Sequence, residues 1–315
     1  MPRALVHTGM ELEYDTFGSP ADPALLLIMG FTAQMTAWEP EFCQLLANGG
    51  RYVIRFDNRD CGLSTKLDGQ VPDVAGAMTS AFAGTAAPPQ PYLLADMALD
   101  AVGLLDVLGI EKAHILGVSM GGMIAQTIAI NHPDRVRSLI SVMSTPGEIE
   151  VGQPSEEAMV AIMSPPAANR EEYIATSSRY MVWQSKKYRN EARTKELAAR
   201  DYDRSSYPEG ATRQMAAIYA SGSRKESLQV LDVPTLVIHG RDDQLITPSA
   251  GFRTAELIPG AHLLFVSDMG HDLPEPLWPL VTDAVLNHTS CAQVIGSSSA
   301  AAPATDVHDR AASDL

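Results

Sequence analysis

The sequence predicts an α/β protein with a mostly parallel central sheet, helices on both faces of the sheet and an inserted helical cap. Short apolar runs such as ALLLIMG (24–30) and AHILGVS (113–119) are typical of buried strands, and they alternate with segments of helical periodicity. Residues 147–228 interrupt this alternation with helical patterns alone. Alternating strands and helices form βαβ units, so the strands of the sheet should run mostly parallel.

Each element follows from a local pattern. Residues 4–18 alternate around a Thr-Gly turn, which predicts a β-hairpin and adds antiparallel strands at one edge of the sheet. Continuous apolar character predicts core strands at 24–30, 51–57, 113–119, 138–145, 235–240 and 263–269. Helical spacing predicts helices at 92–109, 120–133, near 249–258 and at 275–288.

These elements divide the chain into three regions. Residues 1–146 and 229–290 should form the core, and residues 147–228 the cap or lid. The last segment, 291–315, is rich in small and polar residues and poor in large apolar ones, which predicts a disordered tail.

Composition excludes several classes of function. The formal net charge of −15 disfavours binding to nucleic acid or to anionic lipid, because both need a basic surface. The three cysteines, Cys43, Cys61 and Cys291, show no C-x-x-C spacing, which disfavours a disulfide framework or a zinc site. The sequence shows neither a signal-like apolar segment at its start nor an apolar run long enough to cross a membrane. We therefore expect a cytoplasmic protein with no integral membrane segment; composition does not predict its oligomeric state.

The strongest chemical signal is Ser119, which stands between Gly117 and Gly121 in GVSMGG. A predicted strand runs into this serine and a predicted helix follows it, as at the sharp turn that exposes a nucleophile. Small residues two before and two after the serine prevent collisions at such a turn. The start of the helix would stabilise negative charge beside the serine.

Two other interpretations fit this stretch. Ser119 could only cap the helix that follows it. Gly117, Ser119 and Gly122 also approximate a dinucleotide-binding loop, but that reading needs an acidic residue near the end of the next strand. The next strand, SLISVMST, has none.

A nucleophilic serine needs a base and an acid, which should follow later strands in the order serine, acid, histidine. His271 directly follows the strand-like run LLFVSDM, whereas the other histidines lie in helices, at the wrong ends of strands or before the acid. Asp243 follows the strand TLVIHG and is the preferred acid. The adjacent Asp242 is barely distinguishable from it by sequence.

Acyl transfer also needs two N–H donors for the oxyanion that forms on the substrate. One should be the backbone amide of Met120, which follows the nucleophile. The other should be the amide of Phe31, just after the early strand 24–30. Both side chains could equally serve apolar packing.

These motifs together resemble the α/β-hydrolase family over about residues 5–288. The matching blocks are LLLIMGF followed by Trp38, RFDNRDCGLS, GVSMGG, GRDDQLITP and MGHDLP. The segments DNRDCGLST and GVSMGGMIAQ are similar to those of the aclacinomycin methylesterase type and of actinobacterial lipase/esterase-like proteins. Two residues depart from the family pattern: Met29 replaces a frequent histidine, and Asp60 replaces a usual glycine. The first departure implies that the oxyanion loop is supported differently.

The motifs and the resemblance imply a serine hydrolase that cleaves a carboxylic ester through an acyl-enzyme, without a cofactor or metal. Its partner would be a small-molecule ester, of small to medium size and lipophilic. Alternatives on the same triad are thioester hydrolysis, C–C bond hydrolysis, acyl transfer and cofactor-free perhydrolase or haloperoxidase activity. A non-catalytic ligand-binding protein is a further alternative. Residues that could line the pocket, or form the core of the cap, are Met163, Tyr180, Met181, Trp183, Met215 and Tyr219.

Overall fold

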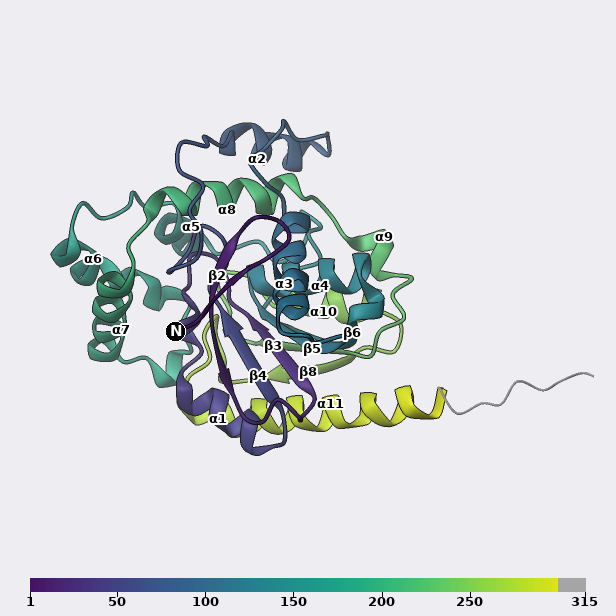
Figure 1. Ribbon diagram of the computed structural model, residues 1–315. Coiled ribbons are helices and arrows are strands. Elements are labelled where there is room, and N and C mark those ends of the chain that lie inside the picture. Colours follow the sequence, from purple (N-terminus) through teal and green to yellow (C-terminus); the bar gives the residue numbers. More distant parts are fainter. Residues whose placement is uncertain (300–315) are drawn as a thin grey trace, which may run out of the picture.

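The structure, a computed structural model, describes residues 1–299 and is built around an eight-stranded sheet (Figure 1). The strand order is β1-β2-β4-β3-β5-β6-β7-β8. All neighbours from β4 to β8 in this order are parallel, and β1 and β2 form the expected antiparallel hairpin at one edge. The predicted fold class is therefore confirmed. The strands are β1 (Arg3–Leu5), β2 (Glu11–Phe17), β3 (Ala24–Ile28), β4 (Tyr52–Phe56), β5 (Ala113–Val118), β6 (Val136–Val142), β7 (Thr235–Gly240) and β8 (His262–Val266).

Helices cover both faces of the sheet, and each face has its own apolar core. On one face, α1 (Pro40–Asn48) and α11 (Trp278–Ser299) pack together through residues such as Phe42 and Val285. The other face is covered by α3 (Leu94–Val107), α4 (Met120–Asn131) and α10 (Ser249–Leu257). Burial on both faces explains why the core strands are apolar without alternation.

The segment between β6 and β7 is helical, and it lies over the carboxyl ends of the strands. It contains α5 (Glu156–Ile162), α6 (Arg170–Thr176), η3 (Ser177–Trp183), η4 (Lys186–Tyr188), α7 (Glu191–Arg204), α8 (Pro208–Ala220) and α9 (Lys225–Leu228). A second segment joins it, because α2 (Val74–Ala83) packs against α8 (Figure 1). Helix α2 is absent from the elements predicted above, because its small residues give little contrast between apolar and polar faces, although Asp73 caps it by accepting from Gly76 N.

The C-terminal helix runs further than expected. Residues 291–299 were predicted to be disordered, but they continue α11 to Ser299. The preceding part of α11 is held by Arg51, which donates hydrogen bonds to Thr289 Oγ1 and Ser290 Oγ. The rest of the predicted tail, 300–315, lies outside the described residues. Among residues 1–299, no helix combines the length and hydropathy that a bilayer span requires.

Candidate active site

Ser119 occupies a sharp turn between β5 and α4, at the carboxyl edge of the sheet. Its backbone has φ 55° and ψ −122°, a strained conformation for a residue other than glycine. Its carbonyl accepts from Gly122 N and Met123 N, so the backbone begins the helix, but its side chain makes no capping hydrogen bond. The helix-capping reading of this serine is therefore wrong.

The two glycines around Ser119 are required by close backbone approach. A Cβ atom on Gly117 would lie 2.0 Å from Gly121 O, and one on Gly121 would lie 2.2 Å from Ile28 O. Carbon and oxygen cannot approach so closely, and backbone atoms cannot move aside as a flexible side chain could. The turn can form only with glycine at both positions.

The acid and the histidine meet at the ends of β7 and β8. His271 Nδ1 lies 2.7 Å from Asp243 Oδ2, and the Asp243 side chain is wholly buried. The other carboxylate oxygen, Oδ1, accepts from the backbone amides of Leu245 and Ile246, both at 2.9 Å. Asp242 remains partly exposed beside Arg241. Of the two adjacent aspartates, Asp243 is the one in contact with His271.

A second histidine, His239 at the end of β7, also contacts Asp243. Its Nε2 donates to Ile246 O at 2.8 Å and lies 3.4 Å from Asp243 Oδ2. Burial works to raise the pKa of Asp243, but the two histidines outweigh it and hold this pKa below its usual value. The chain order serine, acid, histidine excludes His239 as the base, and no local pattern in the sequence indicates its contact with Asp243.

The proposed oxyanion donors lie on both sides of Ser119. A Cβ atom on Gly30 would lie 3.1 Å from Ser119 Cβ and 3.6 Å from Ser119 Oγ, so the loop after β3 lies directly against the serine. Within residues 1–299, the amides of Phe31 and Met120 donate to no acceptor. The Ser119 hydroxyl likewise makes no hydrogen bond to His271, a contact that in serine hydrolases often tightens only when substrate binds.

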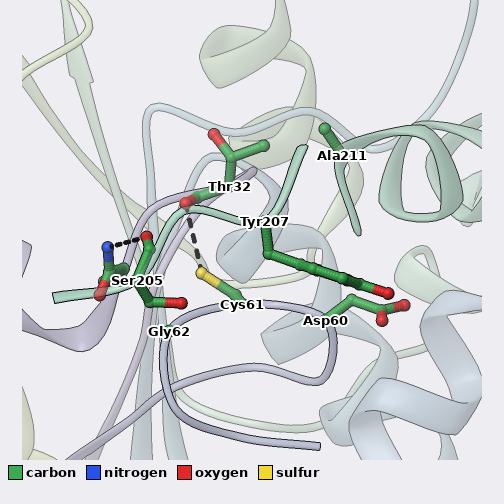
Figure 2. Close-up of a pocket in the computed structure, with 8 residues that line it drawn as sticks. Thr32, Asp60, Cys61, Gly62, Ser205, Tyr207 and Ala211 are labelled. Carbon is green, nitrogen blue, oxygen red and sulfur yellow. Dashed lines mark hydrogen bonds between the residues drawn. The ribbon is translucent and has the colours of Figure 1, made fainter. Parts of the chain in front are cut away.

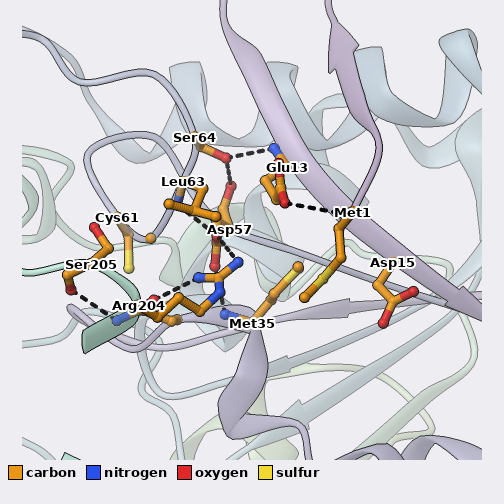
Figure 3. A network of polar contacts seen from close by, with 12 residues as sticks. Met1, Glu13, Asp15, Met35, Asp57, Cys61, Leu63, Ser64, Arg204 and Ser205 are labelled. Carbon is orange, nitrogen blue, oxygen red and sulfur yellow. Dashed lines mark hydrogen bonds and ion pairs between the residues drawn. The ribbon is translucent and has the colours of Figure 1, made fainter. Parts of the chain in front are cut away.

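The loop after β3 is supported by the block 57–63, which replaces the support expected from a histidine at position 29. Asn58 Nδ2 donates to Met29 O at 2.9 Å, and Asp57 Oδ1 accepts from Met35 N at 2.7 Å. Asp57 Oδ2 accepts from Leu63 N and from Arg204 of α7, as Figure 3 shows. Through these hydrogen bonds and the ion pair with Arg204, Asp57 connects both the loop and the cap to the core.

Asp60, at the position of the family's usual glycine, has a positive φ of 62° and binds the cap. Its two carboxylate oxygens accept from Arg213 of α8 at 2.8 and 2.9 Å. Hydrogen bonding to Asp60 raises the pKa of Arg213, which therefore stays charged. Beside this pair lies a polar cavity of about 30 Å³, shown in Figure 2. It has room for a water molecule, and it is lined by Thr32, Gln34, Asp60, Cys61, Gly62, Ser205, Tyr207 and Ala211.

The loop that carries His271 is bound to the cap as well. His271 N donates to Trp183 O at 2.7 Å, and Gly270 N donates to Ser185 Oγ at 2.8 Å. Asp272 Oδ1 accepts from Ser185 N at 2.8 Å and from the Ser185 hydroxyl. The segment around Trp183 therefore lies directly over the histidine.

The six cap residues predicted to line a pocket or to form the core of the cap lie in different surroundings. Tyr180 and Trp183 pack on each other with ring centroids 5.2 Å apart, beside the His271 loop. Tyr219 packs on Phe82 of α2, and Met163 is about half exposed. Of these candidates, the Tyr180–Trp183 pair is the one that lies beside the His271 loop.

A strained serine, a buried carboxylate–imidazole pair and two free amides can together perform nucleophilic acyl transfer. In this arrangement the imidazole would accept the serine proton, and the carboxylate would orient the imidazole. The amides would face the negative charge that develops on a carbonyl oxygen.

Comparisons with known proteins agree with this fold. The chain is 26% identical over 317 residues to rhodomycin D methylesterases of Streptomyces sp. strain C5 and Streptomyces peucetius, covering 93% of this chain and 99% of theirs. It is 31% identical to a 2-hydroxymuconate semialdehyde hydrolase of Pseudomonas putida, over 54% of this chain and 60% of the other. An enol-lactonase structure from Burkholderia xenovorans superposes with a TM-score of 0.68 at 23% identity, covering 92% of this chain and 100% of the other. The sequence model of the alpha/beta hydrolase fold matches residues 23–275. The chain therefore belongs to the alpha/beta hydrolase fold family, and it is a hydrolase related to methylesterases.

Proposed function

We propose that this protein hydrolyses a carboxylic ester through an acyl-enzyme formed on Ser119. The observation that carries the proposal is the 2.7 Å contact between His271 and buried Asp243, at the sheet edge where the strained turn presents Ser119. A buried carboxylate fixes one imidazole tautomer and stabilises the imidazolium that forms when the serine loses its proton.

The residues of this chain and one water molecule supply every group that ester hydrolysis needs. Ser119 Oγ attacks the acyl carbon while His271 Nε2 takes its proton, and the amides of Phe31 and Met120 bind the oxyanion. His271 then protonates the leaving alcohol as the ester C–O bond breaks. Water next attacks the acyl-enzyme, giving its proton to His271, which returns it to Ser119 as the carboxylic acid leaves.

The substrate class we propose is a small to medium lipophilic ester, bound between the core and a cap formed by residues 147–228. Aromatic side chains beside the His271 loop, Tyr180 and Trp183, support an apolar substrate. Similarity to rhodomycin D methylesterases supports an ester over other bonds. We also propose a cytoplasmic location, on the basis of cysteine usage.

The test is labelling with a fluorophosphonate probe, which reacts only with an activated serine. We expect the wild-type protein to be labelled and Ser119→Ala to be unlabelled, with ester turnover lost in parallel. An unlabelled wild-type protein would overturn the proposal. A panel of p-nitrophenyl esters of rising acyl length, run beside an acyl thioester and 2-hydroxymuconate semialdehyde, ranks the ester against the other hydrolase activities. The semialdehyde is included because of the 31% identical relative.

The adjacent aspartates provide a matched pair for the acid. Asp243→Asn should lower kcat by about 10³–10⁴-fold, because the amide favours the wrong histidine tautomer. Asp242→Asn, one residue away and not in contact with His271, should stay near the wild-type rate. If Asp242→Asn is the more damaged variant, the assignment of the acid is wrong.

A further inference from the structure

One of the cap's contacts with the proposed oxyanion loop is a buried amide side chain, Gln214 of α8. Its Oε1 accepts a hydrogen bond from Thr32 N at 2.9 Å, and its Nε2 donates to Arg59 O at 3.1 Å. The side chain is only 1% exposed. An N–H group needs an acceptor and a carbonyl needs a donor, so only this orientation of the amide satisfies both partners.

Thr32 is held in a conformation that it would rarely adopt alone. Its φ is 58°, which is uncommon for a β-branched residue. Such strain persists only where neighbouring groups fix the residue. Gln214 holds the Thr32 amide, and the Cys61 thiol donates to Thr32 O at 3.2 Å. The peptide on each side of Thr32 is therefore fixed.

The cap supports only the second half of this loop, whereas the core contributes to both halves. Up to Gly30 the support comes from the core, because Asn58 binds Met29 O and Gly30 lies against Ser119. From Thr32 onward the cap contributes as well: besides Gln214, Gln34 Nε2 donates to carbonyl oxygens of the segment 201–205. Phe31, whose amide is the proposed donor, lies where the two kinds of support meet.

We infer that Gln214 is a positioning residue of the oxyanion hole, so that docking of the cap completes the hole. The inference rests on the ester hydrolysis proposed above. Thr32 N belongs to the peptide next to the one that carries the Phe31 amide, and the two peptides share the Phe31 Cα atom. Loss of the Gln214 acceptor would free the Phe31–Thr32 peptide and misdirect the Phe31 donor. Ser119, His271 and Asp243 would not be touched.

The test is Gln214→Met, which keeps the length of the side chain and removes both hydrogen bonds. We expect kcat to fall about 10- to 100-fold, somewhat less than the effect of deleting an oxyanion donor outright, with KM within about twofold. The affinity for an alkyl trifluoromethyl ketone, which forms a tetrahedral oxyanion on serine, should fall by the same factor as kcat/KM. A purely structural role would not change this affinity.

The matched control is Gln126→Met. Gln126 is equally buried, and its amide also bonds at both ends, to Ser141 Oγ at 3.1 Å and from Arg224 Nε at 2.9 Å, away from the oxyanion loop. It should lower the melting temperature but leave kcat and ketone affinity unchanged.

If Gln214→Met does not accumulate as folded protein, Gln214→Asn retains a buried amide that is one methylene too short, and it should show the same effect on kcat and ketone affinity. Folded Gln214 variants with wild-type kcat and ketone affinity would overturn the inference. An unlabelled wild-type protein would instead overturn the proposed function.

Discussion

The cap meets the core on two sides of Ser119, and the two junctions differ in how their less exposed carboxylates are bound. On the oxyanion side, Arg213 pairs with Asp60 at 2.8 Å and Arg204 with Asp57 at 2.7 Å, with both carboxylates wholly buried. On the histidine side, the partly buried carboxylate of Asp272 is bound by the amide and hydroxyl of Ser185. Among residues 1–299, no lysine or arginine forms an ion pair with Asp272. The adjacent His271 favours its charged form and so works to lower its pKa.

This difference predicts which junction holds the cap to the core more strongly. A buried ion pair holds two segments together, and loss of one partner leaves a charge without compensation. A carboxylate bound only by neutral donors keeps part of its desolvation cost in the folded state. Burial accordingly raises the pKa of Asp272, and the hydrogen bonds from Ser185 oppose this only in part. We therefore expect the cap to be anchored on the oxyanion side and to be easier to loosen beside His271.

The largest expected effect comes from breaking the Arg213–Asp60 pair. Arg213→Met should lower the free energy of unfolding by about 3–5 kcal/mol, because it leaves the Asp60 carboxylate buried and unpaired. Adding Asp60→Gly removes that carboxylate and places glycine at a positive φ, so the double variant should regain much of the loss. Urea unfolding measures all three proteins. A double variant no more stable than Arg213→Met would show that the unpaired charge is not the cause.

The sequence predicts residues in local motifs better than it predicts contacts between the cap and the core. Ser119 and His271 follow from contiguous motifs, because the turn around each depends on neighbouring residues. The departure of Asp60 from the family pattern is visible, but its partner lies 153 residues away in a cap helix. Gln214 is still less visible, since nothing in its local sequence distinguishes it from an ordinary polar helical residue. Contacts between distant segments depend on how the cap is placed, and the local sequence does not encode that placement.

A smaller effect is expected where the cap lies on the histidine loop. In Gly270→Ala, the new Cβ atom would lie 2.4 Å from Trp183 O and 2.6 Å from Ser185 N, so the two segments must separate. We expect a loss of about 1–3 kcal/mol in unfolding free energy, as for an overpacked site, together with a lower kcat because His271 is the next residue. Thermal unfolding and ester turnover measure the two effects. Unchanged turnover in a destabilised variant would mean that the cap does not position His271.

The smallest expected effect has the opposite sign. Asp272→Asn keeps the oxygen that accepts from Ser185 and removes a partly buried charge, so it should slightly stabilise the protein at pH 7. The folded-state pKa of Asp272 is raised, so the native state binds a proton more readily than the unfolded state, whose pKa is about 3.9. Wild-type stability is therefore reduced as pH rises through the window between the two pKa values, and the advantage of the variant should vanish as pH falls towards 4. Melting temperatures from pH 4 to 7 measure this difference. The control, Asp268→Asn, alters an exposed carboxylate paired with Lys187 and should show no such gain. An Asp272→Asn protein less stable than the wild type at pH 7 would mean that the histidine-side junction depends on the charge, and the contrast between the two junctions would fail.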